Sequence, residues 1–100
     1  MPRRHYPDLH PLMQRTKRNY RSASRISDLL NRDGTACTYC GRPFTKSTRR
    51  PTIDHRHPLS RGGADDRSNW ALACRDCNQA KADIPESAFR WAMNQLAGRP

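Results

Sequence analysis

The feature that most constrains the fold is a pair of C-x-x-C motifs, Cys37-Thr-Tyr-Cys40 and Cys74-Arg-Asp-Cys77, in a sequence of 100 residues. A chain this short forms one domain with a small core, and only 34% of its residues are hydrophobic, so part of its stability is expected to come from a metal or from disulfides. Four thiolates form a closed tetrahedral zinc site, which contributes on the order of 10–16 kcal/mol to folding. We therefore predict one structural Zn²⁺ bound by Cys37, Cys40, Cys74 and Cys77, with disulfides or a thiol redox motif as the alternatives.

The charge of the chain points to an anionic partner. The net charge is +10, from 19 basic and 9 acidic residues, which is typical of nucleic-acid-binding proteins. No apolar run approaches the ~20 residues needed to cross a bilayer, and the first residues lack the apolar segment of a secretory signal. These observations predict a cytoplasmic protein without a membrane partner, and in that reducing setting C-x-x-C pairs are more often metal ligands than disulfides.

The N-terminal part of the chain differs in composition from the rest. Residues 1–21 hold three prolines and six Lys or Arg residues without any apolar period. We predict a flexible basic arm that becomes ordered on a phosphate backbone, with a solubilising tail as the alternative, and we assign no catalytic role to its two histidines, His5 and His10. Residues 22–100 are predicted to form the folded domain.

Local patterns predict few elements in that domain. Ile26, Leu29 and Leu30 indicate an amphipathic helix over residues 22–31, and Thr52-Ile53-Asp54-His55 suits a short strand. A helix is predicted from Cys74, and another over about 86–97. We expect the last helix to pack through Phe89, Ala92, Met93 and Leu96.

The insert between the cysteine pairs carries the candidate chemistry. Asp54 and His55 are adjacent and, on a strand, project to opposite faces unless the chain bends. Asn69 and Asn78 follow, the second just after Cys77. An Asp-His dipeptide alone is more often structural than catalytic, but this one lies between two zinc-ligand pairs in a strongly basic chain.

The run I-D-H-x-x-P-L-S-x-G-G, followed by N-W-x-L-x-C-x-x-C-N-x-x-K, resembles the HNH endonucleases of the ββα-metal superfamily. The resemblance covers residues 37–81. It implies a small α+β fold in which two antiparallel strands and a helix surround a catalytic metal, here combined with a four-cysteine zinc site and flanking helices.

The resemblance also implies roles for individual residues. His55 would be the general base, Asp54 a ligand of the catalytic metal, and Asn69 the residue that holds the loop around His55. Asn78 occupies the last motif position, where many relatives have His, and would be the second metal ligand. Because carboxylate and amide oxygens are hard ligands, Mg²⁺ or Mn²⁺ is expected, with Ni²⁺ or Zn²⁺ as alternatives.

The expected activity is metal-dependent hydrolysis of DNA phosphodiester bonds, by nicking or by double-strand cleavage, leaving a 5′ phosphate and a 3′ hydroxyl. The alternative is a zinc-dependent module that binds nucleic acid without cutting it. We expect binding mainly to the phosphate backbone, in a bacterial or phage-infected cell, by a monomer or weak dimer with a phage terminase as a partner. The residues expected to contact phosphate are Arg49, Arg50, Arg61 and Lys81. His57 is expected to be a surface or loop histidine, with a second metal ligand or a phosphate contact as the alternative, and Trp70 and Trp91 are expected to pack.

Overall fold

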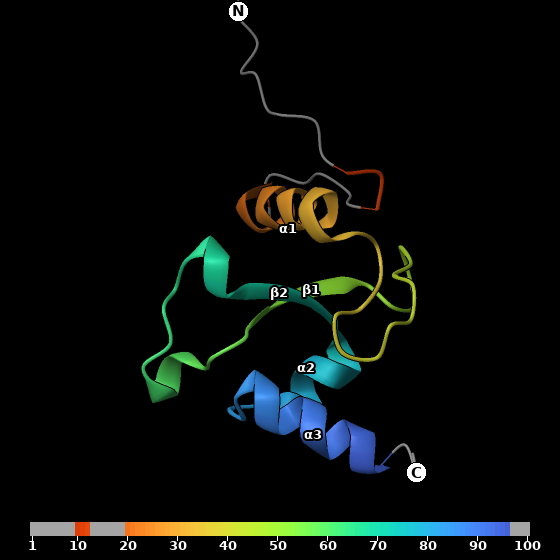
Figure 1. Ribbon diagram of the computed structural model, residues 1–100. Coiled ribbons are helices and arrows are strands. Elements are labelled where there is room, and N and C mark those ends of the chain that lie inside the picture. The colour runs from red at the N-terminus through yellow and green to blue at the C-terminus, as the bar shows by residue number, and fades with distance from the viewer. Residues whose placement is uncertain (1–9, 13–19, 97–100) are drawn as a thin grey trace, which may run out of the picture.

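The computed structural model describes residues 10–12 and 20–96, without the side chains of Tyr20 and Arg21. A two-stranded antiparallel sheet lies between one helix on one side and two helices on the other (Figure 1). The order along the chain is α1 (Tyr20–Asp33), β1 (Pro51–His55), β2 (Trp70–Cys74), α2 (Arg75–Lys81) and α3 (Glu86–Leu96). This arrangement is the α+β, ββα fold that the sequence predicted.

The sheet places the two ends of the central motif side by side. β1 pairs with β2 from Pro51↔Cys74 to His55↔Trp70, so the His55 end of β1 lies beside the start of β2. Residues 71–74 of β2 are all buried, as expected for a strand covered on both faces. The connection between the strands contains two short 3₁₀ helices, Leu59–Arg61 and Arg67–Asn69.

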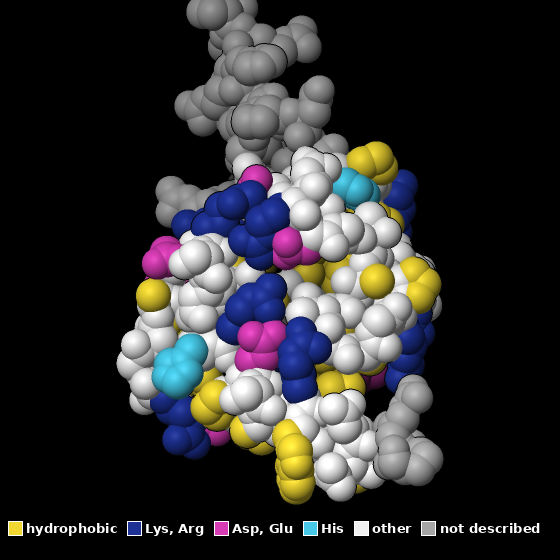
Figure 2. Space-filling model, in the orientation of Figure 1, with side chains coloured by type: hydrophobic (Ala, Val, Ile, Leu, Met, Phe, Trp, Pro, Cys, Tyr) yellow, Lys and Arg dark blue, Asp and Glu magenta, His cyan; other side chains and the backbone are white. Residues whose placement is uncertain are grey.

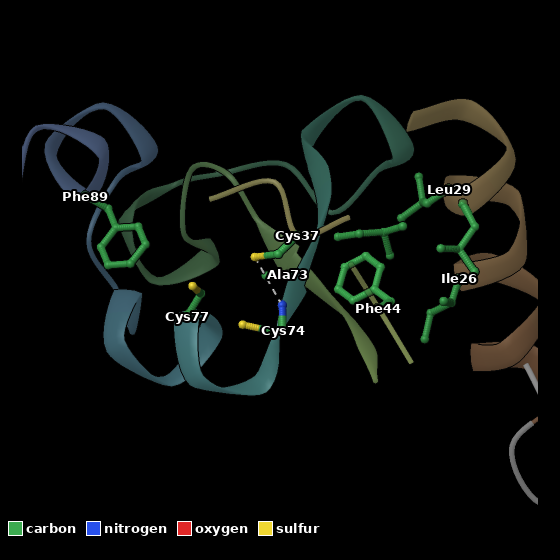
Figure 3. Close-up of a cluster of buried hydrophobic side chains, with 10 residues drawn as sticks. Ile26, Leu29, Cys37, Phe44, Ala73, Cys74, Cys77 and Phe89 are labelled. Carbon is green, nitrogen blue, oxygen red and sulfur yellow. Dashed lines mark hydrogen bonds between the residues drawn. The ribbon is translucent and has the colours of Figure 1, made fainter. Parts of the chain in front are cut away.

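The core is continuous with the cysteine region. Ile26, Leu29 and Leu30 of α1 are buried against the sheet, and each fully buried Leu or Ile contributes roughly 1.5–3 kcal/mol. Figure 3 shows Phe44 between the α1 side chains and the cysteines. The buried cluster comprises Ile26, Leu29, Leu30, Cys37, Phe44, Leu72, Ala73, Cys74, Cys77 and Phe89.

The last helix follows its predicted bounds but not all of its predicted packing. Phe89 is buried and Met93 packs against the core, whereas Leu96 is 87% exposed and Trp91 is 65% exposed. The predictions that Leu96 and Trp91 serve packing are therefore wrong. Trp91 lies two residues beyond Phe89, which at 3.6 residues per turn puts it on the opposite side of the helix, and α3 extends past the core before Leu96.

Part of the predicted arm contacts the domain. The backbone N–H of His10 donates to Ser27 Oγ at 2.6 Å, and Leu12 packs against the core cluster. The helix α1 begins at Tyr20, inside the range assigned to the arm. The predictions for residues 1–9 and 13–19, His5 included, lie outside the described residues. Among the helices that are described, none has the length and apolarity that crossing a membrane requires.

Candidate metal centre and active site

The four cysteines converge on one point, as predicted. Their Sγ atoms all lie within 4.8 Å of one another, and Cys40 Sγ is 3.9 Å from Cys74 Sγ. A tetrahedral zinc with Zn–S bonds of ~2.3 Å needs sulfur–sulfur separations of about 3.8 Å, so a small contraction around the ion satisfies its geometry. Figure 3 shows the sulfurs of Cys37, Cys74 and Cys77 facing a common centre. The donor set therefore fits a structural zinc.

Backbone geometry prepares one of these thiols for a metal. The N–H groups of Tyr39, Cys40 and Cys74 point at Cys37 Sγ from 3.4, 3.5 and 3.4 Å. Burial raises the pKa of Cys37, but these N–H groups outweigh it and bring the pKa to about 7. Gly41, with a φ of 76°, makes the tight turn after the second sulfur. The chain thus stabilises a thiolate before any metal arrives.

A second site lies at the other end of β1. A hollow of about 240 Å³ is lined by Ile53, Asp54 and His55, by residues 58–60 of the following loop and, from the end of α2 and just beyond it, by Asn78, Ala82 and Asp83. Three of the four residues predicted to be catalytic, Asp54, His55 and Asn78, therefore line one hollow. Asn69 does not line it.

Two side chains of α2 cover the outer edge of β1. Asn78 Nδ2 donates to Thr52 Oγ1 at 3.0 Å and to the carbonyl of Ile53 at 3.3 Å. One turn later, Lys81 Nζ donates to the carbonyl of His55 at 2.8 Å. These contacts satisfy carbonyls that a two-stranded sheet leaves unpaired. The two bonds from Nδ2 fix the orientation of the Asn78 amide. Its Oδ1 has no hydrogen-bond partner among the described residues and can therefore serve as a ligand.

Asp54 is buried and held by two donors. Its side chain is 5% exposed, the hydroxyl of Tyr39 donates to Oδ2 at 2.6 Å, and Lys81 Nζ lies 3.2 Å from Oδ2 and 3.4 Å from Oδ1. Burial, followed by the bond to Asp54, raises the pKa of Tyr39, which keeps the phenol protonated as a donor. Oδ2 therefore carries the closest contacts, and Oδ1 retains capacity for a ligand.

The position of Lys81 corrects one prediction. We expected a surface lysine that contacts phosphate, but its side chain is completely buried and its ammonium bonds Asp54 and His55. A buried ammonium needs such compensation because desolvating an unpaired charge is costly. In this structure Lys81 supports the site from within.

His55 has a carboxylate partner that the sequence did not indicate. Its Nε2 lies 2.8 Å from Asp65 Oδ1, which also accepts a bond from Trp70 Nε1 at 3.2 Å. The bond from His55, and then that from Trp70, lowers the pKa of Asp65, so its carboxylate is charged at neutral pH. Trp70 is half-buried against the core, in agreement with its expected structural role.

Asn69 ties the loop after β1 into a closed shape. Its Oδ1 accepts from the backbone N–H of His57 at 3.0 Å, and its Nδ2 donates to the carbonyls of His57 and Ala64 at 2.9 and 2.7 Å. Gly63 lets its own backbone pass close to that of His57, because a Cβ at residue 63 would lie 1.9 Å from the His57 carbonyl oxygen. The amide of Asn69 therefore joins the two ends of the loop that leads from His55 to Asp65. His57 is exposed, and among the described residues its ring bonds the Arg61 carbonyl alone, at 3.0 Å.

The remaining predicted phosphate contacts lie on the surface in different settings. Arg61 borders the hollow but bonds Asp83, through the carbonyl at 2.6 Å and the carboxylate at 3.6 Å. Arg49 donates to the carbonyl of Pro43 at 3.1 Å, and Arg50 is exposed. None of these three arginines lines the hollow that holds Asp54, His55 and Asn78.

Sequence reasoning missed two residues of the site, Tyr39 and Asp65. Tyr39 lies inside the first C-x-x-C motif, which the sequence indicated only as a metal-binding motif. Its hydroxyl donates to the carboxylate of Asp54, 15 residues away. Asp65 is one of two adjacent aspartates in a polar loop, and nothing in that pattern distinguishes it from Asp66.

Comparison with known proteins agrees with this geometry. Residues 37–83 match the family model described as HNH endonuclease. The chain is 32% identical over 99 residues, 91% of its length, to the CRISPR-associated endonuclease Cas9 of Actinomyces naeslundii. It is 35% identical over 66 residues, 65% of its length, to the CRISPR-associated endonuclease Cas9 of Corynebacterium diphtheriae. The aligned regions span only 9% and 6% of these relatives.

Proposed function

Residues 37–83 belong to the HNH endonuclease family, and from that premise we propose that this domain hydrolyses DNA phosphodiester bonds with the help of a divalent metal. The observation that carries the proposal is the hollow at the end of β1, which combines a carboxylate, an imidazole and an amide from Asp54, His55 and Asn78. A module that only binds nucleic acid does not require this combination.

The catalytic metal would be held by Oδ1 of Asp54 and Oδ1 of Asn78. An all-oxygen donor set with one carboxylate suits Mg²⁺ or Mn²⁺, which usually complete their coordination with water and substrate phosphate. When bound, such an ion stabilises the negative charge that develops on the phosphate and on the leaving oxygen. Ni²⁺ and Zn²⁺ remain the alternatives for this site.

His55 would act as the general base. With Asp65 accepting a bond from Nε2, the neutral imidazole keeps its proton there and its lone pair on Nδ1. Nδ1 has no hydrogen-bond partner among the described residues and would take the proton of the attacking water. Asn69 would keep this arrangement by holding the loop between His55 and Asp65.

Several finer properties are part of the proposal. One site acts on one strand, so a single copy of this domain would nick DNA and two copies would be needed for a double-strand cut. The products would carry a 5′ phosphate and a 3′ hydroxyl. A phage terminase as partner, and a monomer or weak dimer in a bacterial cell, stay predictions of the family resemblance.

The test is a supercoiled-plasmid assay with wild-type protein and His55→Ala, first in EDTA and then with each candidate metal. Wild type should nick the plasmid only with added metal, and His55→Ala should be at least ~10²-fold slower, as expected for the loss of a general base. Zinc content and the far-UV circular dichroism spectrum of the variant are measured in parallel.

Two outcomes would contradict the proposal. A folded, zinc-loaded His55→Ala that cuts like wild type would exclude His55 as the base. A wild-type protein that is inert with every metal, yet still binds DNA, would favour the zinc-dependent binding module.

A further inference from the structure

A second hollow lies beside the first and differs from it in charge, because two arginines line the second and two aspartates line the first. It has a volume of about 390 Å³ and lies between the start of α1, residues 47–52 and the first residue of α2. Among the described residues that line it, the polar ones are Ser22, Ser47, Thr48, Arg50, Thr52 and Arg75, and none is acidic. We call it the basic groove.

The basic groove lies where positive charge is not neutralised. On the face shown in Figure 2, Lys and Arg side chains lie directly beside Asp and Glu side chains. Of the twelve Lys and Arg side chains described, six form ion pairs, namely Arg32, Arg56, Arg61, Arg67, Lys81 and Arg90. Of the other six, one is Arg25 and five lie between residue 42 and the first residue of α2, namely Arg42, Lys46, Arg49, Arg50 and Arg75.

The hollow lined by Asp54, His55 and Asn78, which is proposed to be the active site, is called the catalytic hollow. It adjoins the basic groove along β1. Thr52 lines the groove, Ile53 and Asp54 line the catalytic hollow, and Asn78 Nδ2 donates to Thr52 Oγ1 at 3.0 Å. Thr52 and Asp54 are two residues apart, roughly 7 Å along a strand. The two hollows therefore border neighbouring residues of the same strand.

We propose that the basic groove binds a backbone phosphate of the substrate strand, close to the phosphate that is cut. Guanidinium groups and hydroxyls are the donors that phosphate oxygens accept from, and Arg50 and Arg75 would supply the charge. The catalytic hollow cannot serve this purpose without its metal, because it is lined by Asp54 and Asp83. The identity of the ligand as DNA rests on the proposed function.

The first experiment compares two double variants that lose the same charge. Arg50→Ala/Arg75→Ala removes the groove arginines, and Arg42→Ala/Lys46→Ala removes two exposed basic residues that do not line the groove. Binding to a short DNA duplex is measured with the zinc-loaded protein and no other metal added, by fluorescence anisotropy across ~50–200 mM salt. The groove variant should raise Kd roughly tenfold or more and reduce the salt slope by about two, whereas the control should change Kd less than about threefold.

Equal losses in the two variants would overturn the proposal, because binding would then follow net charge alone. Arg50→Lys/Arg75→Lys, which retains both charges, should restore most of the affinity. It also keeps the test decisive if the alanine variant does not fold, as judged from zinc content and circular dichroism.

The second experiment locates the phosphate. Single methylphosphonates, which lack the charge, are placed around the preferred cleavage site of a short duplex. At one position close to the cut, neutralising the phosphate should slow cleavage by wild type and have little effect on Arg50→Ala/Arg75→Ala. If the same position matters equally to both proteins, the groove is not its binding site.

The outcomes separate the two proposals. If wild type cuts DNA but the groove variant binds like the charge-matched control, the groove assignment fails and the nuclease stands. If wild type is inert with every metal but the groove variant alone loses affinity, the groove binds nucleic acid and the catalytic proposal fails.

Discussion

The cysteine cluster and the catalytic hollow lie at opposite ends of the same two strands, and they are built on different principles. The cluster gathers four sulfurs within 4.8 Å in a largely buried setting. The hollow is open and is lined by a carboxylate, an amide and an imidazole, and the side chains of Asp54, Asn78 and His55 each bond another protein group. The comparison shows that the cluster needs only backbone groups around its four sulfurs, whereas the residues of the open hollow are held by side chains from other parts of the chain.

The two regions are nevertheless physically connected. Tyr39 lies between two zinc ligands in the sequence, and its hydroxyl donates to Asp54 at 2.6 Å. Its ring packs edge-to-face on Phe89 of α3 with the centroids 5.2 Å apart. The loop that carries two of the zinc ligands therefore also orients a proposed ligand of the catalytic metal.

The largest effect is expected from the cysteine cluster. Cys77→Ser should abolish the cooperative fold, because a structural zinc contributes on the order of 10–16 kcal/mol, as much as the whole stability of a small domain. Circular dichroism and bound-zinc analysis measure this, with His55→Ala as the control that keeps its zinc. A Cys77→Ser variant that melts like wild type would show that the cluster is not what holds the fold.

The next largest effect is expected at the buried ion pair. Lys81→Met keeps the size of the side chain but leaves Asp54 buried without its cation. In the zinc-loaded protein without added Mg²⁺ or Mn²⁺, this should lower the free energy of unfolding by about 3–5 kcal/mol. The matched control is Arg90→Met, whose ion pair is exposed and should be worth about 1 kcal/mol or less. Urea unfolding compares the two variants, and equal losses would contradict this account of Lys81.

A smaller effect is expected at the link between the regions. Tyr39→Phe removes one hydrogen bond to a carboxylate and should cost about 1–2 kcal/mol. It should also slow cleavage roughly tenfold, because a proposed metal ligand loses its orientation, while bound zinc stays at the wild-type level. Thr38→Ala, in the same C-x-x-C motif, is the control. If Tyr39→Phe cuts at the wild-type rate, the two regions act independently.

The smallest effect is expected at the exposed carboxylate that bonds His55. Asp65→Asn keeps an acceptor beside His55 but removes the negative charge, so cleavage should slow by less than about tenfold with no change in thermal stability. Asp66→Asn is the matched neighbour, since Asp66 bonds Ser68 and not His55. A larger loss of rate in Asp66→Asn than in Asp65→Asn would argue against the His55–Asp65 pair.

The sequence predicted which residues belong to each region better than it predicted which side chains contact them. Cysteine spacing identified the whole cluster, and the period of apolar residues located α1 and α3. The same local patterns misjudged Lys81, Trp91 and Leu96, because the burial of a side chain depends on which distant element covers it. Asp65 and Tyr39 escaped notice for a related reason: their partners are 10 and 15 residues away, and no local pattern encodes such contacts.

By itself, then, the amino-acid sequence determined the strand β1, the helices, the four thiol ligands and the resemblance of residues 37–81 to HNH endonucleases, and the second strand was expected only from that resemblance. These depend on spacing over a few residues, which is set by the backbone geometry of helices, strands and tight turns. Only the tertiary structure decided that Lys81 is buried on Asp54, that Asp65 bonds His55 and that the basic groove opens next to the catalytic hollow. Such contacts arise when α1, α2 and the loops pack around the sheet, because packing brings distant side chains together and removes them from water.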